Sequence, residues 1–128
     1  EIMALYMGGR SDEALGAIRR WWGGMLRAGA TTFFESFDPD AVDGEIYAKD
    51  GDPFGNCLCH ASACGPAALL PIVVFGFEPM ADGWKERFNA EKSPLGEANL
   101  TVPTPDGAVM LESKEGVISI QEAHDPIQ

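Results

Sequence analysis

Residues 100–120 read LTVPTPDGAVMLESKEGVISI, and this stretch decides the fold of the C-terminal third of the chain. Apolar runs lie on both sides of Asp106-Gly107, a pair that is typical of the tight turn in a β-hairpin. A second turn signal at 114–116 separates this hairpin from a further apolar run at 117–120. We therefore predict antiparallel β-strands that are joined by short turns.

The sequence before this β region shows the 3.6-residue period of helices. Helices are predicted over 2–7, from Ser11 to about Gly29, and over 61–75. Ser11 is a suitable N-cap, because its hydroxyl can accept a hydrogen bond from a free backbone N–H of the first turn. Pro71 is expected to kink the third helix or to set its true start, since proline lacks the backbone N–H.

Between the second and third predicted helices, residues 38–56 are rich in Asp, Gly and Pro, the residues that favour turns. We predict a long acidic loop there, and long loops of this kind often carry function. Residues 84–91 alternate in character and predict a strand, so the β region is expected from about residue 84 onward. Helices followed by antiparallel strands make the predicted fold class α+β.

The composition excludes several classes of partner. Of the 128 residues 45% are hydrophobic, so a packed core is expected. Twenty acidic residues oppose nine basic ones, and the net charge of -11 repels phosphate backbones. The longest apolar run, 67–77, is shorter than the ~20 residues needed to cross a bilayer. We therefore expect neither nucleic acid nor membrane as a partner.

Three cysteines cannot all pair within one chain, which favours a reducing compartment and a cytoplasmic location.

The segment 54–66, FGNCLCHASACGP, concentrates Cys57, Cys59, His60 and Cys64. A zinc site would need four side chains around one ion, but adjacent residues point apart and zinc sites usually combine two separated pairs. A cysteine nucleophile with a histidine base is another interpretation, although such partners usually meet across a fold. The remaining alternative treats the cysteines as small buried hydrophobic residues. We predict no metal and no cofactor.

The segment 29–40, GATTFFESFDPD, places Glu35 between Phe33-Phe34 and Phe37. Aromatic neighbours desolvate a carboxylate and raise its pKa, as happens at many catalytic sites. Aromatic rings also suit the apolar faces of pyranose sugars, whose hydroxyls bind carboxylates. Glu35 is therefore a candidate catalytic residue, and the alternative is a glutamate on the outer face of an amphipathic turn.

Two tryptophans, Trp21 and Trp22, stand late in the second predicted helix. Packing in the core is the ordinary role of tryptophans on the apolar face of a helix. The alternative is that one of them lines a sugar site, and we assign that position to Trp22.

Four motifs, GATTFFESFDP, PFGNCLCHASACGPAALLP, FGFEP and LTVPTPDG, occur in this order along the chain. Together they resemble the C-terminal part of bacterial alpha-L-rhamnosidases of glycoside hydrolase family 78, and the resemblance spans residues 21–112. It implies that residues 1–77 are the last helices of an (α/α)6 toroidal catalytic domain. It also implies that residues 78–128 are part of an antiparallel β-sandwich domain.

The same resemblance implies inverting hydrolysis of terminal alpha-L-rhamnosides, in which one carboxylic acid protonates the leaving oxygen and a carboxylate activates water. Glu35 matches the glutamate that resembles the general base. His60 matches a histidine that contacts the substrate, and Phe34 stands at an aromatic position beside the base. The sequence departs from the family pattern at Cys57, which replaces a serine, and in lacking a tryptophan shortly after His60.

The resemblance places the general acid upstream of the residues present here. We therefore expect a piece of a longer enzyme, with an upstream part of the catalytic domain as partner and a rhamnoside as substrate. These residues alone are expected to be inactive, because protonation of a leaving group is worth about 10²–10⁴-fold in rate. A non-catalytic carbohydrate-binding or assembly module is the alternative function, and a small metal-binding protein is a third.

Overall fold

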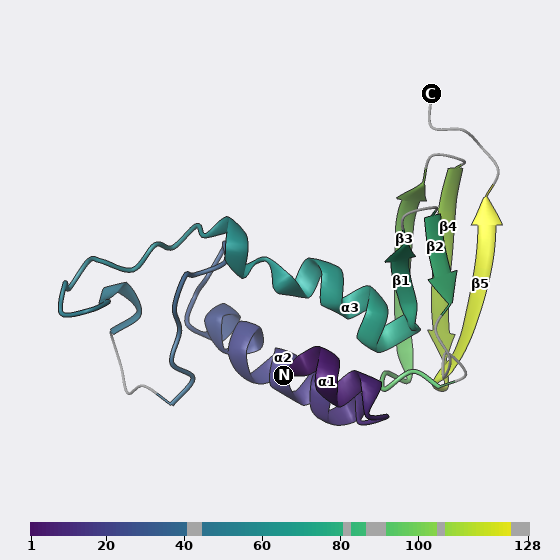
Figure 1. Cartoon of the computed structure of the whole chain (residues 1–128), viewed down its shortest axis with the longest axis horizontal. Helices are drawn as coiled ribbons and strands as arrows, with labels where there is room; N and C mark the ends of the chain where they lie inside the picture. The colour runs from purple at the N-terminus through teal and green to yellow at the C-terminus, as the bar shows by residue number, and fades with distance from the viewer. Residues whose placement is uncertain (41–44, 81–82, 87–91, 105–106, 124–128) are drawn as a thin grey trace.

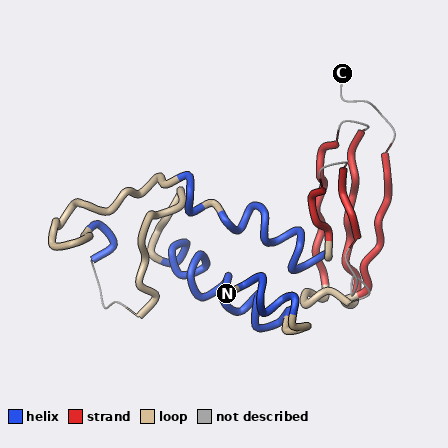
Figure 2. The backbone as a smooth tube through the Cα atoms, viewed as in Figure 1, coloured by secondary structure: helices blue, strands red, loops and turns tan. Residues whose placement is uncertain are grey.

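Helices and strands occupy opposite ends of an elongated molecule in the computed structural model of the chain (Figure 1) (Figure 2). The structure describes residues 1–40, 45–80, 83–86, 92–104 and 107–123. The helices precede the strands in the chain, and the strands are antiparallel. The predicted α+β class is thus confirmed. No helix within these described ranges has the length and apolar character to span a bilayer.

The first two helices are α1, Ile2–Met7, and α2, Ser11–Arg27, and both lie within the predicted ranges. The predicted N-cap of α2 is wrong, because Ser11 is already the first helical residue and the cap position is Arg10, without a side-chain cap bond. Arg10 instead donates a hydrogen bond of 2.6 Å to Glu13 one turn further along. The buried side of α2 carries the apolar residues Ala14, Leu15, Ile18 and Met25.

The third helix, α3, spans Gly65–Phe75 and is preceded by a single 3-10 turn, η2, at Ala61–Ala63. The predicted helix over 61–75 is therefore two elements. Pro71 lies inside α3 and does not mark its start. The helix ends at Gly76, whose φ of 64° lies in the left-handed region that glycine adopts without steric cost.

Among the described residues that follow, five strands form two sheets. The first sheet pairs β1, Phe77–Met80, with β2, Gly83–Glu86, and the second has the order β3-β4-β5. The strands of this second sheet are Glu97–Thr104, Gly107–Lys114 and Val117–Ala123. The β region thus begins at Phe77, earlier than the predicted residue 84. Of the predicted strand at 84–91, residues 84–86 belong to β2 and residues 87–91 lie outside the described residues.

Both predicted hairpins of the second sheet are confirmed by the register. Thr104 faces Gly107 at the end of β3 and β4, although Asp106 of the predicted turn lies outside the described residues. Lys114 faces Val117 across the turn between β4 and β5. The two residues of that turn, Glu115 and Gly116, have φ values of 52° and 78°, which is the geometry of a tight hairpin loop.

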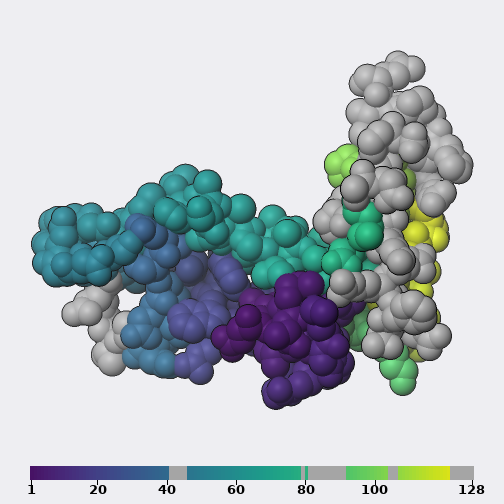
Figure 3. Space-filling model, viewed as in Figure 1, coloured from purple at the N-terminus to yellow at the C-terminus, as the bar shows by residue number. Residues whose placement is uncertain are grey.

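The apolar core lies where the helices meet the sheet. One buried cluster joins residues of α2, α3, β1, β3 and β4: Ala14, Leu15, Ile18, Val73, Val74, Phe75, Phe77, Val102 and Leu111. This cluster contains residues from both sides of the predicted domain boundary between residues 77 and 78. The boundary itself stays a prediction. At the other end of the helices, the segment that holds residues 47–60 projects farthest from the sheet (Figure 3).

Candidate functional site

The candidate site is built on the extended segment 32–37 that leaves α2. The segment 56–60 lies beside it, because the Glu35 N–H donates to the carbonyl oxygen of Cys57 at 2.8 Å. The His60 N–H likewise donates to the carbonyl oxygen of Phe33 at 2.8 Å. The hydroxyl of Thr32 adds a bond to the carbonyl oxygen of Leu58. Two of the stretches that the sequence analysis selected are therefore neighbours in space.

A buried asparagine fixes the position of this pair of segments. Asn56 Oδ1 accepts from the N–H and the hydroxyl of Ser36, each at 3.1 Å. Its Nδ2 donates to the carbonyl oxygen of Ser36 at 2.9 Å and to that of Ile46 at 2.6 Å. The amide is thus used on both sides, which is the expected state of a buried polar group. The role of Asn56 could not be predicted from the sequence, since it depends on contacts between residues that are distant in the chain.

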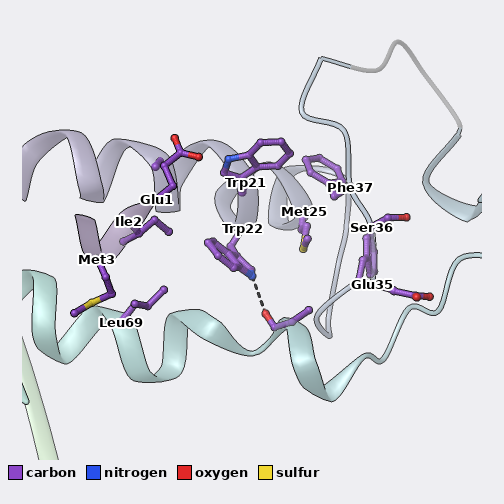
Figure 4. Close-up of a pocket in the computed structure, with 13 residues that line it drawn as sticks. Glu1, Ile2, Met3, Trp21, Trp22, Met25, Glu35, Ser36, Phe37 and Leu69 are labelled. Carbon is purple, nitrogen blue, oxygen red and sulfur yellow. Dashed lines mark hydrogen bonds between the residues drawn. The ribbon is translucent and has the colours of Figure 1, made fainter. Parts of the chain in front are cut away.

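A cavity of ≈ 650 Å³ lies between the helices and the segment 34–37. Its walls include Ile2, Trp21, Trp22, Met25, Phe34 and Phe37 (Figure 4). Phe34 is only 4% exposed and belongs to the packed floor. Trp22 is half-buried, and its indole Nε1–H donates to the carbonyl oxygen of Ala63 at 2.9 Å. The cavity therefore has aromatic walls whose positions are fixed by packing and by this hydrogen bond.

Two aromatic residues of this cavity were not among the predicted site residues. Trp21 lines the cavity and is 39% exposed, which makes it the more accessible of the two tryptophans. Adjacent helical residues point about 100° apart, so two neighbouring tryptophans cannot both enter the core. Phe37 closes on Gly24 so tightly that a Cβ there would lie 2.5 Å from its ring atom Cε1. Gly24 therefore makes room for this ring.

Glu35 stands at the edge of the cavity, but its carboxylate is directed away from Trp22 and Met25 (Figure 4). It forms an ion pair with Lys49 from the loop. The two side chains are 28% and 29% exposed respectively. This ion pair could not be read from the sequence, because the loop residue that reaches Glu35 depends on how the loop folds.

The pKa of the Glu35 carboxyl is lowered from its ordinary value. The main cause is the hydrogen bond from Lys49, which favours the charged form more than burial disfavours it. The aromatic neighbours of Glu35 predicted a raised pKa, and that prediction is wrong. At neutral pH Glu35 is consequently an ionised carboxylate.

His60 is half-buried on the segment beside Glu35 and is not one of the residues that line the cavity. The electrostatic effect of His60 is one of the smaller causes that lower the pKa of Glu35, so the two groups are electrostatic neighbours. The structure thus brings Glu35, Phe34 and Trp22 to one cavity, with His60 on the adjoining segment.

All three cysteines carry free thiols and are exposed. The interpretation of Cys57, Cys59 and Cys64 as buried hydrophobic residues is therefore wrong. Among the residues described by the structure, no three or more His, Cys, Asp or Glu side chains are grouped so that they could hold a metal ion. The geometry of this segment therefore does not support the zinc interpretation.

Comparison with models of known protein families finds no match to the sequence, and comparison with curated proteins finds no significant match.

Proposed function

We propose that the chain is part of a glycoside hydrolase that resembles the inverting alpha-L-rhamnosidases, with Glu35 as the general base. In this proposal α1 to α3 are the last helices of an (α/α)6 toroid, and the three-stranded sheet is part of a β-sandwich. The substrate is a terminal alpha-L-rhamnoside. An upstream part of the catalytic domain supplies the general acid, and the enzyme works in the cytoplasm.

The observation that supports this proposal most is the position of a carboxylate at the edge of an aromatic-walled cavity. Glu35 lines the same cavity as Trp21 and Trp22. Aromatic faces suit the apolar side of a pyranose, and a small number of polar groups then fix its orientation. His60, beside Glu35, is the group that we assign to a sugar hydroxyl.

The chemistry requires a base that is ionised before water attacks the anomeric carbon. The lowered pKa of Glu35 meets this requirement at neutral pH. Lys49 binds Oε1, so we assign the acceptance of the proton from water to Oε2. In an inverting enzyme the acid lies on the opposite side of the sugar, with the two carboxyl groups roughly 6.5–9.5 Å apart.

Sugar binding by the chain itself is the first test. Methyl alpha-L-rhamnoside is titrated into labelled protein, and the indole N–H signals of the tryptophans are followed by NMR. Specific shifts of the Trp21 and Trp22 signals are expected, with glycerol at equal concentration as the control ligand. Absence of these shifts would contradict the assignment of the cavity to sugar.

Hydrolysis of p-nitrophenyl alpha-L-rhamnoside by the chain joined to its upstream domain is the second test. Glu35→Gln keeps the shape of the side chain and removes the base, so turnover should fall by about 10²–10⁴-fold. Glu112→Gln on β4 is the matched control and should leave turnover unchanged. Unchanged hydrolysis in Glu35→Gln would overturn the proposal.

A non-catalytic carbohydrate-binding or assembly module is the second candidate. It is favoured by the orientation of the Glu35 carboxylate, which pairs with Lys49 and faces away from the tryptophan rings. In such a module the rings bind the sugar and the carboxylate has only a structural role. Sugar binding that is retained in Glu35→Gln, without any rhamnoside hydrolysis, would favour this function.

A further inference from the structure

The loop between α2 and α3 supplies one cation to the candidate site, Lys49, which pairs with Glu35. We propose that Lys49 is the positioning residue of this site, because its ammonium group holds Oε1 of the Glu35 carboxylate. This inference deepens the proposed function and depends on it for its catalytic meaning.

The backbone of Lys49 is held in a tight turn. Its N–H donates to the carbonyl oxygen of Asp52, and its own carbonyl oxygen accepts from the Asp52 N–H, both at 2.9 Å. The two residues between them, Asp50 and Gly51, have φ values of 52° and 84°. Two consecutive left-handed residues are the geometry of a type I′ turn, whose twist suits closely paired flanking residues. The start of the lysine side chain is consequently fixed relative to this turn.

The backbone of Glu35 is held just as firmly from the other side. Its N–H is bonded to Cys57, and the next residue, Ser36, is bonded on both sides by the amide of Asn56. Most ion pairs at protein surfaces contribute little, because two mobile side chains must be ordered to form them. Here both backbones are ordered by other bonds, so the pair costs less side-chain and loop entropy to form.

The ion pair therefore restricts the carboxylate to one orientation. Nζ of Lys49 engages Oε1, which limits rotation about the last bond of the glutamate. The charged and titratable groups near the pair are Asp50, Cys57 and His60. Asp50 lies on the same loop as the lysine, and Cys57 and His60 belong to the segment beside Glu35. A loss of Lys49 would leave the Glu35 carboxylate without its cation and free to rotate.

NMR titration of the Glu35 carboxyl carbon tests this role without any need for enzymatic activity. The signal is assigned by its loss in Glu35→Gln. In Lys49→Met the pKa of Glu35 should rise from its value in the unmodified chain, and Lys49→Arg should restore most of the difference. Lys114→Met is the matched control, since it removes the lysine of an ion pair with Glu112 on the sheet, 2.9 Å long. It should leave the Glu35 titration unchanged.

Equal pKa values for Glu35 in the unmodified chain and in Lys49→Met would overturn the inference, and the proposed function would still stand. The shift of the Trp22 indole signal reports whether each variant is folded. If Lys49→Met does not fold, Lys49→Gln provides the answer, because it also removes the cation and should raise the pKa of Glu35. Failure of the proposed function has a different signature, which is unchanged rhamnoside hydrolysis in Glu35→Gln. In the joined enzyme, Lys49→Met should shift the acid limb of kcat/KM to higher pH and change KM little.

Discussion

The side chain of Asn56 bonds the backbone of Ser36 on both sides, although the two residues are 20 positions apart in the sequence. Oδ1 accepts from the N–H at 3.1 Å, and Nδ2 donates to the carbonyl oxygen at 2.9 Å. This is how one strand pairs with its neighbour, with a side chain in place of the second backbone. The asparagine is 7% exposed, so water cannot replace these bonds.

Asn56→Ala should therefore lower the free energy of unfolding by about 2–4 kcal/mol, because it removes the partner of three part-buried backbone groups, the Ser36 N–H and the carbonyl oxygens of Ser36 and Ile46. Urea denaturation followed by tryptophan fluorescence measures this change. Asn99→Ala, at an exposed position on β3, is the matched control and should change stability by less than ~0.5 kcal/mol. Equal effects of the two substitutions would show that Asn56 does not hold the two segments together.

Two of the three glycines of α2, Gly16 and Gly24, make a second pair of predictions. Gly16 has open space where a Cβ would lie, so Gly16→Ala should stabilise the chain by about 0.5–1 kcal/mol through helix propensity. The Cβ of Gly24→Ala would meet the Phe37 ring at 2.5 Å, and overpacking of this kind costs about 1–3 kcal/mol. Thermal unfolding should place Gly24→Ala below Gly16→Ala. Removal of the ring in Gly24→Ala/Phe37→Ala should relieve the clash, and no relief would contradict this account.

The two tryptophans should respond differently to the same substitution. Trp22→Phe removes the indole N–H that binds the carbonyl oxygen of Ala63, and a loss of about 1 kcal/mol is expected. Trp21→Phe retains an exposed ring and should change stability by less than ~0.5 kcal/mol. Chemical denaturation of both variants checks this. A larger loss of stability in Trp21→Phe than in Trp22→Phe would mean that Trp21, and not Trp22, is the tryptophan held by the fold.

The ion pair of Glu35 and Lys49 predicts a defined dependence of stability on pH. The pKa of Glu35 is lowered in the folded chain, so its contribution is present above the ordinary value of 4.5 and is lost as the pH falls through the folded pKa. The pKa of Lys49 is raised, so its contribution is complete below the ordinary value of 10.5 and is lost at more alkaline pH.

The stability difference between the unmodified chain and Glu35→Gln should thus be largest between these two limits and should shrink on both sides. Urea denaturation at a series of pH values measures the difference. Glu112→Gln removes the same charge from a different ion pair and corrects for the change in net charge. A difference that does not vary with pH would show that the pair is not formed in solution.

Local chemistry explains which parts of the fold could be predicted. The turn before β5 contains Gly116, which adopts a positive φ without steric cost, so the position of the turn could be predicted from the sequence. The start of the β region was placed too late, because a single left-handed residue, Gly76, separates the apolar end of α3 from the apolar strand β1. An uninterrupted apolar run does not reveal such a change of period.

The site was less predictable than the fold. Glu35 and Trp22 line one cavity, and both stand near the end of α2 in the sequence. Lys49 and Asn56 could not be found, since their roles depend on how a long loop returns to the segment 32–37. The predicted direction of the Glu35 pKa shift was wrong for the same reason, because this direction is set by a cation 14 residues away.

Phe77 lies at the start of the first strand, yet it is 4% exposed within the cluster that α2 and α3 also build. If either the helical end or the sheet unfolds, the Phe77 ring becomes exposed to water. Proteolytic cleavage between the two ends would therefore produce two fragments with exposed apolar surfaces. The rates of amide hydrogen exchange in α3 and β4 should rise and fall together when the stability of the chain is changed.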